Sequence, residues 1–395
     1  MPSKVLPTLS ASNRILYLDS ARGLAALSMV VWHFFTAFFP IEGPSFVRDS
    51  PFHFLWYGDA DMTFFFIHSG FILTYTNRQF LGGLSGASYA RFLVSRAFRI
   101  YPLFLVVLLL SRVLATTIYP ISSGGYLTPH FLRFWSFHKG WGDVARQALL
   151  VVRIPGNSVE RYMPQDWSLS VELIVSAFLP LLSWLMKKNS WVCCVLIVLL
   201  AKIPGLSTFV LEFGVGVFLC HFTDRIKTLW SQLNRVGHYT IVGLALVCFT
   251  CVFHYSDYFG GRELFLSQRT DRLIVTAGCG LIFIILLNSS RLQKLLSGRV
   301  WVRIGEVCYG IYLFHILLLI VCSDYMMQLL VAGTRLPLWV DKVIVLLLVQ
   351  GLSIGLAFVT FFGVERPMIR LGKRLTGGRK REEKKYDPGY QQISQ

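Results

Sequence analysis

The stretch L-D-S-A-R-G-L-A-A-L-S-M-V-V-W-H-F-F, Leu18 to Phe35, begins polar and then turns apolar for most of a membrane-spanning length. It carries two side chains that a bilayer helix normally avoids, Arg22 at its entrance and His33 eleven positions further on. At about 1.5 Å per residue they lie roughly 16 Å apart, about half of the ~30 Å hydrocarbon layer. Because an ionisable group at that depth is costly unless it faces the protein interior, both are functional candidates. The alternative is structural: a His bonded to a neighbouring helix and an Arg that reaches the membrane surface.

The composition of the whole chain is typical of a membrane protein. Of its 395 residues, 54% are hydrophobic and only 15% are charged, whereas soluble globular domains carry about 25% charged residues. Repeated apolar runs of about 20 residues predict an all-α, polytopic integral membrane protein. The net charge of +17 does not indicate nucleic-acid binding, because the basic residues lie mostly at the ends of apolar runs and in short loops.

The apolar runs predict about ten transmembrane helices, with both termini in the cytoplasm. We expect these helices near residues 22–39, 61–75, 96–116, 165–187, 191–201, 206–220, 239–253, 273–287, 304–321 and 343–362. Residues 1–18 then form a cytoplasmic arm, 19–370 the membrane domain, and 371–395 a basic tail that we expect to be disordered. The expected location is the plasma or inner membrane.

The charges in the loops indicate which side of the membrane each loop faces. Dense basic clusters fall in the loops assigned to the cytoplasm, and the acidic loop with Glu42 and Asp49 falls outside, as the positive-inside rule requires. The segment from Thr117 to Asp166 is the exception, because it places Arg133 and Arg146 on the outside. It contains no apolar run long enough to cross, so we expect it to cover the outer face or to be partly re-entrant.

Six short stretches, in this order, resemble the acyltransferase family 3 membrane proteins, which transfer acyl groups, often acetyl, to hydroxyls of glycans and other small molecules. They are the opening stretch, F-F-F-I-H-S-G-F from Phe64, R-A-F-R-I-Y-P from Arg96, W-S-L-S-V-E from Trp167, Y-G-I-Y-L-F-H from Tyr309 and V-E-R-P from Val364. The resemblance covers nearly the whole chain. It identifies the chain as a stand-alone member of the family without the C-terminal esterase-like domain that some members carry.

The resemblance implies roles for particular residues. The family's Arg-to-His pair in the first span matches Arg22 and His33. In this family that His is expected to be central to acyl transfer. Its R-x-x-R pair, expected to hold the acyl donor, matches Arg96 and Arg99. The W-S-L-x-x-E element ends at Glu172.

The chemistry of these residue types points the same way. A neutral imidazole, with an ordinary pKa of ~6.5, suits the removal of a proton from an acceptor hydroxyl, so His33 is the expected catalytic base. A carboxylate commonly orients such a base, and Glu172 is the candidate, provided that it meets His33 at mid-membrane. Arg22, Arg96 and Arg99 offer bidentate contacts to the phosphates of an acyl-CoA. The alternative for Arg96 and Arg99 is positive-inside anchoring.

Other residues in the quoted stretches are weaker candidates. Asp19, Ser170 and Tyr101 are possible additional site residues. His68 departs from the family pattern, and it either pairs with another polar group of the core or tunes the choice of acceptor. His315 matches a family His and belongs either to the site or to structural hydrogen bonding. We expect Glu365, with Arg366, to close the end of the last span structurally.

The sequence therefore predicts a membrane O-acyltransferase that uses acyl-CoA, in particular acetyl-CoA, as the donor. The expected acceptor is a glycan, a lipid-linked sugar or a small molecule, and membrane lipids surround the protein. No metal is expected, because the cysteines show no metal-ligand spacing with histidines. The rival functions are a proton-coupled transporter of a small anionic or sugar-like substrate, which the lack of an internal repeat disfavours, and a non-enzymatic scaffold.

Overall fold

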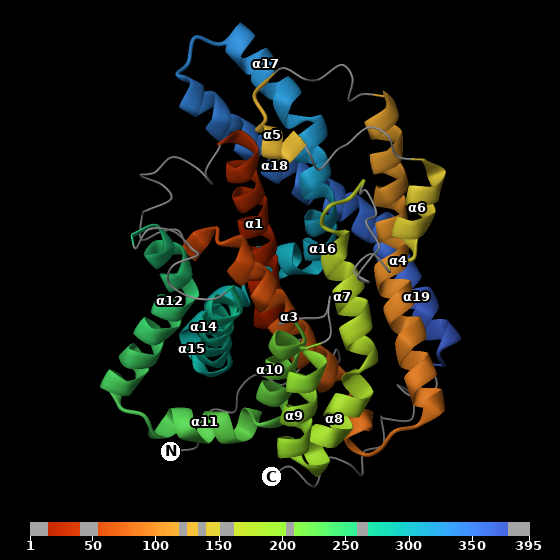
Figure 1. Ribbon diagram of the computed structural model, residues 1–395, viewed down its shortest axis with the longest axis vertical. Coiled ribbons are helices and arrows are strands. Elements are labelled where there is room, and N and C mark those ends of the chain that lie inside the picture. Colours follow the sequence, from red (N-terminus) through yellow and green to blue (C-terminus); the bar gives the residue numbers. More distant parts are fainter. Residues whose placement is uncertain are drawn as a thin grey trace.

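A computed structural model describes residues 15–39, 54–117, 125–132, 140–150, 162–202, 209–258 and 268–377. Within these ranges every regular element is a helix, so the all-α prediction is confirmed (Figure 1). Most of the predicted N-terminal arm and of the basic tail lie outside the described residues, as do Glu42, Asp49 and Arg133.

Each of the ten predicted spans coincides with helical structure, and one of them with two consecutive helices. The helices are α1 (Leu16–Phe38), α3 (Gly58–Thr76), α4 (Gly86–Thr117), α7 (Asp166–Ala177), α8 (Leu179–Lys188), α9 (Ser190–Leu200), α10 (Phe209–His221), α12 (Arg235–Tyr258), α14 (Gln268–Asn288), α16 (Arg299–Val321) and α18 (Leu338–Thr360). Shorter helices lie between or after them: η2 (Arg78–Leu81), α5 (Pro129–Leu132), α6 (Trp141–Ala148), α11 (Thr223–Gln232), α15 (Ser290–Leu296), α17 (Ser323–Gly333), η5 (Phe361–Glu365) and α19 (Arg366–Leu375).

Length and composition make five of these helical segments able to cross a membrane, within the part of the chain that is described. They lie in α1, α4, α14, α16 and the continuous run from α18 through α19. The pair α7 and α8, bent by 46° at their junction, brings the number to six if it forms one span. Because α9 has 11 residues and rises only about 16 Å, it is too short to cross alone. The chain is a multi-pass membrane protein, and the count of ten remains a prediction.

The centre of the molecule is the seam between α1 and α16. A Cβ added at Gly23 would lie 2.7 Å from the backbone nitrogen of Gly305, and one added at Gly305 only 2.3 Å from the carbonyl oxygen of Asp19. Two glycines therefore allow the helix backbones to touch. Ten residues further along each helix, the rings of His33 and His315 meet. Contacts at equal spacing show that α1 and α16 run parallel and in register.

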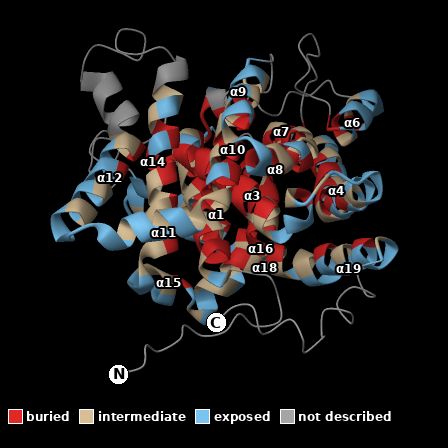
Figure 2. Ribbon diagram, turned by 90° about the horizontal axis from the view of Figure 1, so that it is seen from below, coloured by how far each residue is buried: buried red, intermediate tan, exposed pale blue. Residues whose placement is uncertain are grey.

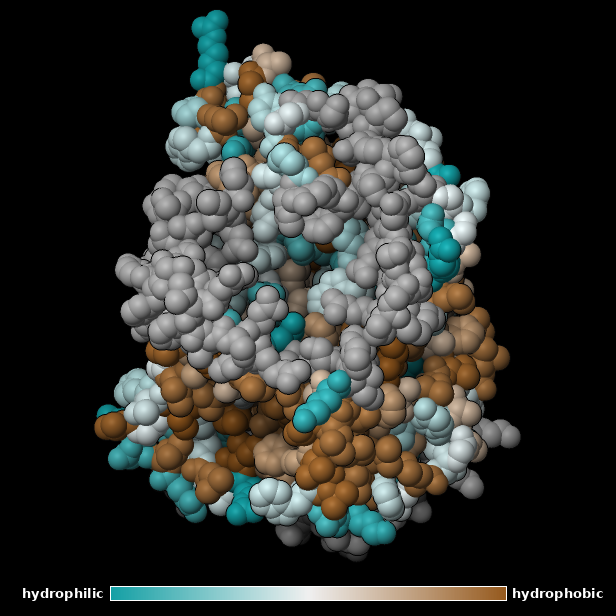
Figure 3. Space-filling model, viewed as in Figure 1, coloured by the Kyte–Doolittle hydropathy of each residue, from teal (hydrophilic) through white to brown (hydrophobic). Residues whose placement is uncertain are grey.

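Burial follows the same arrangement. Buried residues gather on α1, α3, α10 and α16, whereas the peripheral helices α11, α12, α15 and α19 are largely exposed or intermediate (Figure 2). The exposed surface is unusually apolar: along α9, Trp191, Val195 and Leu199 are more than half exposed. Apolar side chains dominate the lower half of the face seen in Figure 3. An apolar exterior around a buried polar centre is the pattern expected of helices that face lipid.

The structure differs from the sequence prediction at the start of α4. We expected a basic loop up to Arg96, but α4 already begins at Gly86, so that Arg91, Arg96 and Arg99 all lie on the helix. Arginine is a good helix former, so a helix can continue through the basic residues beyond its apolar section. As a result Arg96 and Arg99, one turn apart, are held by a rigid element.

Candidate active site: an arginine pocket and a histidine pair

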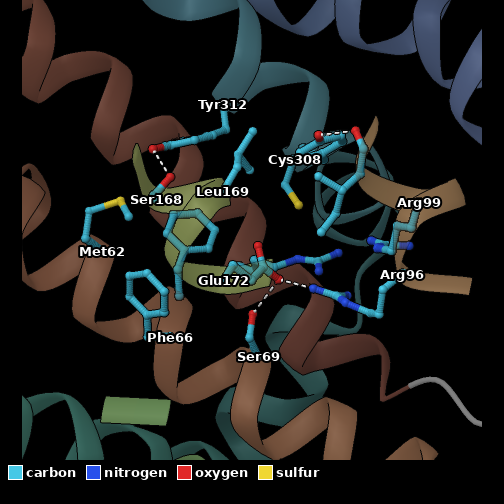
Figure 4. Close-up of a pocket in the computed structure, with 14 residues that line it drawn as sticks. Met62, Phe66, Ser69, Arg96, Arg99, Ser168, Leu169, Glu172, Cys308 and Tyr312 are labelled. Carbon is cyan, nitrogen blue, oxygen red and sulfur yellow. Dashed lines mark hydrogen bonds and ion pairs between the residues drawn. The ribbon is translucent and has the colours of Figure 1, made fainter. Parts of the chain in front are cut away.

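A cavity lies between α1, α3, α4, α7 and α16 (Figure 4). About 650 Å³ of space not filled by atoms lies within it, its open mouth included. We call it the arginine pocket. It is lined by Arg22, Met62, Phe65, Phe66, Ser69, Arg96, Arg99, Ile100, Ser168, Leu169, Glu172, Cys308, Tyr309 and Tyr312.

Glu172 lies at the centre of this pocket (Figure 4). Its Oε1 accepts hydrogen bonds from Nη2 of Arg96 at 2.6 Å and from the hydroxyl of Ser69 at 3.2 Å. The three residues come from α7, α4 and α3, so the interaction joins three helices at one carboxylate oxygen. A short contact between a buried guanidinium and a carboxylate is a charge-assisted bond, and it fixes the direction of the Arg96 side chain.

The other two arginines reach the pocket from α1 and α4. Nη2 of Arg22 lies 3.9 Å from Asp19 and 3.5 Å from the carbonyl oxygen of Gly305, which is the glycine of the α1–α16 contact. Arg99 forms no hydrogen bond or close ion pair with any residue that the structure describes. The pocket therefore contains three guanidinium groups against one lining carboxylate, and it is electrostatically suited to an anion.

A hydrogen-bonded group of polar side chains closes one end of the pocket. The hydroxyls of Tyr312 and Ser168 lie 2.7 Å apart, and the Tyr312 hydroxyl also donates to the carbonyl of Gln165 at 3.2 Å. The Gln165 amide in turn donates to the carbonyl of Leu313 at 2.8 Å. These bonds tie the start of α7 to the middle of α16, and they hold the Tyr312 ring between the pocket and the residues beyond it.

Beyond Tyr312 lie His33 and His315, which we call the histidine pair. Their ring centroids are 5.1 Å apart, and the His315 ring is 5.5 Å from that of Tyr312. His315 is fully buried, and its Nδ1 lies 2.6 Å from the carbonyl oxygen of Tyr312. Because a carbonyl only accepts, Nδ1 is the protonated nitrogen and Nε2 carries the lone pair. That Nε2 is buried and has no hydrogen-bond partner among the described residues.

The predicted site residues therefore form two groups. Arg22, Arg96, Arg99 and Glu172 line one pocket, but His33 does not line it. The expected meeting of Glu172 with His33 is not seen: within the described chain the carboxylate bonds to Arg96 and Ser69, and the ring neighbour of His33 is His315. The physical reason is charge, since a buried carboxylate gains more from a guanidinium than from a neutral imidazole.

Of the weaker candidates, His315 belongs to the histidine pair and Asp19 lies beside Arg22, whereas the other three lie outside both groups. Ser170 is buried with its hydroxyl on the carbonyl of Asp166, 3.2 Å away on its own helix. Tyr101 donates to the carbonyl of Leu149 at 3.4 Å and does not line the pocket. His68 is buried beside the rings of Phe64 and Phe283.

Sequence reasoning missed Tyr309 and Tyr312 as site residues and named Ser168 only within the W-S-L-x-x-E element, although the signal was present. In a helix, positions three and four apart share a face. Glu172 therefore shares a face with Ser168, whereas Ser170 points away from it. Likewise Tyr309 and Tyr312, three positions apart, both line the pocket, and the Tyr309 hydroxyl donates to the carbonyl of Ile100 at 2.7 Å. The described residues contain no group of three or more His, Cys, Asp or Glu side chains able to hold a metal ion.

The comparisons with known proteins agree with this geometry. A family model described as an acyltransferase domain, of the acyltransferase 3 type, matches residues 15–362. That match covers most of the chain, including both groups of site residues. The chain therefore belongs to the acyltransferase 3 family, and it is a membrane acyltransferase. No curated protein and no solved structure matched the chain.

Proposed function

We propose that this protein is an O-acyltransferase that moves an acyl group, in particular acetyl, from acyl-CoA to a hydroxyl of a carbohydrate or another small-molecule acceptor. The observation that carries the proposal is the arginine pocket, in which three guanidinium groups from two helices face one cavity. Membership of the acyltransferase 3 family supports acyl transfer as the reaction, and the charge of the pocket suits a polyanionic donor. The membrane is the plasma or inner membrane, and the donor enters from the cytoplasm.

The phosphates of CoA account for the number of arginines. A guanidinium binds phosphate through two parallel N–H bonds, and it does so better than an ammonium because its donors form a rigid fork. Glu172 holds Arg96 from one side and leaves its remaining donors free, while Arg99 forms no hydrogen bond within the described chain. The role of Glu172 is thus to position a donor-binding arginine.

His33 is the proposed catalytic base. It takes the proton of the acceptor hydroxyl as the hydroxyl oxygen attacks the thioester carbonyl. A carbon–oxygen bond forms, the carbon–sulfur bond breaks, and the protonated imidazole returns its proton to the departing CoA thiolate. His315 replaces the carboxylate that we had expected beside this base. With Nδ1–H held by the carbonyl of Tyr312, its unpaired Nε2 is available to accept a hydrogen bond from the His33 ring.

The acceptor classes remain a glycan, a lipid-linked sugar or a small metabolite. Tyr312 connects the two regions along α1 and α16, because it lines the pocket and its ring lies 5.5 Å from that of His315. The donor's phosphates therefore occupy the pocket, and its flexible arm extends past Tyr312 to bring the thioester to His33. The acceptor approaches His33, which is partly exposed, from the side away from the donor.

The test is transfer of labelled acetyl from acetyl-CoA by the purified protein in lipid vesicles, supplied with a glycan and metabolite extract. We expect label to appear in hydroxyl esters and to disappear on mild alkaline treatment. Ser170→Ala is the matched control, because its hydroxyl bonds only within α7 in the described structure. If the parent protein transfers no label and binds no CoA, the proposed donor is wrong.

A further inference from the structure

Glu365 is a buried carboxylate to which the reaction above gives no role. It is 2% exposed, and neither of its oxygens has a hydrogen-bond partner in the described part of the chain. We had expected Glu365 and Arg366 to close the end of the last span together. The structure separates them: Arg366 is exposed and lies over the ring of Phe362 at 5.7 Å, whereas Glu365 turns inward. An unpaired buried carboxylate is expensive, so it needs cations close by.

The local backbone explains why Glu365 points inward. Residues Phe361–Glu365 form a π-helical turn, η5, in which the N–H of Arg366 donates to the carbonyl of Phe361, five residues earlier. Pro367 follows, and a proline ring clashes with the carbonyl four residues before it, here that of Gly363. The wider turn relieves this clash. Turns of this kind insert one extra residue, rotate the side chains that follow, and occur frequently at functional sites.

The turn lies beside one of the helices that form the arginine pocket. The segment η5 packs against α4, the helix that carries Arg96 and Arg99. The cations that interact with Glu365 are Arg99, most strongly, and Arg22. Both line the pocket, but Glu365 does not. The carboxylate therefore interacts with these two guanidinium groups without lining the cavity.

We infer that Glu365 is a positioning residue that holds Arg99 and Arg22 aimed into the pocket for an anionic donor, and the inference rests on the proposed function. Glu172 does this for Arg96, with which it shares a direct bond. Glu365 supplies a counter-charge for the other two arginines, together with Asp19 in the case of Arg22, and it does not line the pocket in which a phosphate would bind. Phosphate recognition depends on the direction of the guanidinium fork. Removing the Glu365 charge favours anion binding, but the loss of guanidinium orientation weakens it by more.

The experiment is a double-mutant cycle on CoA binding by the purified full-length protein. We expect Glu365→Gln to weaken CoA binding about tenfold, equivalent to about 1.4 kcal/mol. Glu365→Asp, which keeps the charge, restores most of the affinity. The double variant Arg99→Gln/Glu365→Gln is expected to bind CoA only slightly more weakly than Arg99→Gln alone. The effects of residues that act through one another on affinity are not additive. Glu306→Gln is the control, since that carboxylate pairs with the exposed Arg303 at 3.0 Å.

The outcomes separate this inference from the proposed function. If the parent binds CoA and Glu365→Gln binds it equally well or more tightly, the positioning role is wrong and the function stands. Full additivity of Arg99→Gln and Glu365→Gln, or a Glu365→Asp variant as weak as Glu365→Gln, also overturns the role. A parent that binds no CoA contradicts the proposed function itself. Melting temperature, measured on every variant, excludes a general loss of folding as the cause.

Discussion

The arginine pocket and the histidine pair lie along the same two helices, yet they are built in different ways. The pocket collects charged groups from α1, α4 and α7 around a cavity, whereas the histidine pair brings two imidazoles together across the α1–α16 seam. Arg22 and His33, eleven residues and therefore about three turns apart, lie on the same side of α1. One helix thus serves both regions. Under the proposed function, donor binding and proton transfer are therefore separate tasks, and the contact between Gly23 and Gly305 fixes the spacing between them.

The largest expected effect is at the histidine pair. His33→Ala removes the proposed base, and a positioned base contributes about 10²–10⁴-fold to rate. We expect transfer of labelled acetyl to fall by about a thousandfold at saturating donor, with the donor KM unchanged. His315→Ala tests the neighbour in the same assay, and we expect a smaller loss. A His33→Ala variant that transfers label as fast as the parent would remove the histidine pair from the reaction.

Next in size is the effect of removing Arg99, the pocket arginine that forms no hydrogen bond within the described chain. Arg99→Ala is expected to raise the donor KM by about 10- to 100-fold, because a bond to a charged group contributes about 1.5–3 kcal/mol. The maximal rate at saturating donor stays close to that of the parent, since Arg99 does not contact the histidine pair in the described structure. Initial rates over a range of acetyl-CoA concentrations check this. A reduced maximal rate with an unchanged KM would reverse the roles given to the two regions.

The spacing between the regions depends on Gly305. Gly305→Ala places a Cβ 2.3 Å from the carbonyl oxygen of Asp19, so α1 and α16 must separate. We expect a loss of about 1–3 kcal/mol in stability and a decrease in both donor binding and transfer. The control is Gly351→Ala, at a position with no atom within 4 Å of the added Cβ, where alanine stabilises the helix by up to about 1 kcal/mol. Equal melting temperatures for the two variants would show that the close contact is unimportant.

The smallest expected effect is at the boundary between the two regions. Tyr312→Phe removes the hydroxyl that bonds to Ser168 and to the carbonyl of Gln165, but it keeps the ring beside His315. One neutral hydrogen bond contributes about 0.5–1.5 kcal/mol, so we expect a threefold to tenfold loss of transfer. Single-turnover measurements with labelled acetyl-CoA resolve a change of this size. An unaltered rate would mean that the hydroxyl has no part in guiding the donor.

Much of the fold and part of the site were predictable from the sequence. Apolar runs of bilayer length identify helices directly, because each run must satisfy its backbone hydrogen bonds internally. The grouping of Arg22, Arg96 and Arg99 at one end of the helices follows from their positions at the ends of apolar runs. In contrast, the partner of His33 depends on how helices distant in sequence rotate against each other. The glycine contact between Gly23 and Gly305 sets that rotation, and single-sequence patterns do not reveal it.

The inward turn of Glu365 shows the same limit at a smaller scale. In a regular helix, the V-E-R-P stretch gives no reason to place the carboxylate inside and the following arginine outside. The π-helical turn does so, and it arises from a backbone clash at Pro367 rather than from hydrophobic periodicity. A proline just after an intramembrane carboxylate was the available signal. Its interpretation required the neighbouring helix α4 and the arginines on it.

The most direct test of this division of labour is the equilibrium affinity of the purified protein for CoA, measured on the parent, His33→Ala and Arg99→Ala in the same lipid vesicles. We predict that His33→Ala binds CoA as tightly as the parent and that Arg99→Ala binds it at least tenfold more weakly, equivalent to about 1.4 kcal/mol. Weakened binding by His33→Ala together with unchanged binding by Arg99→Ala would contradict the account.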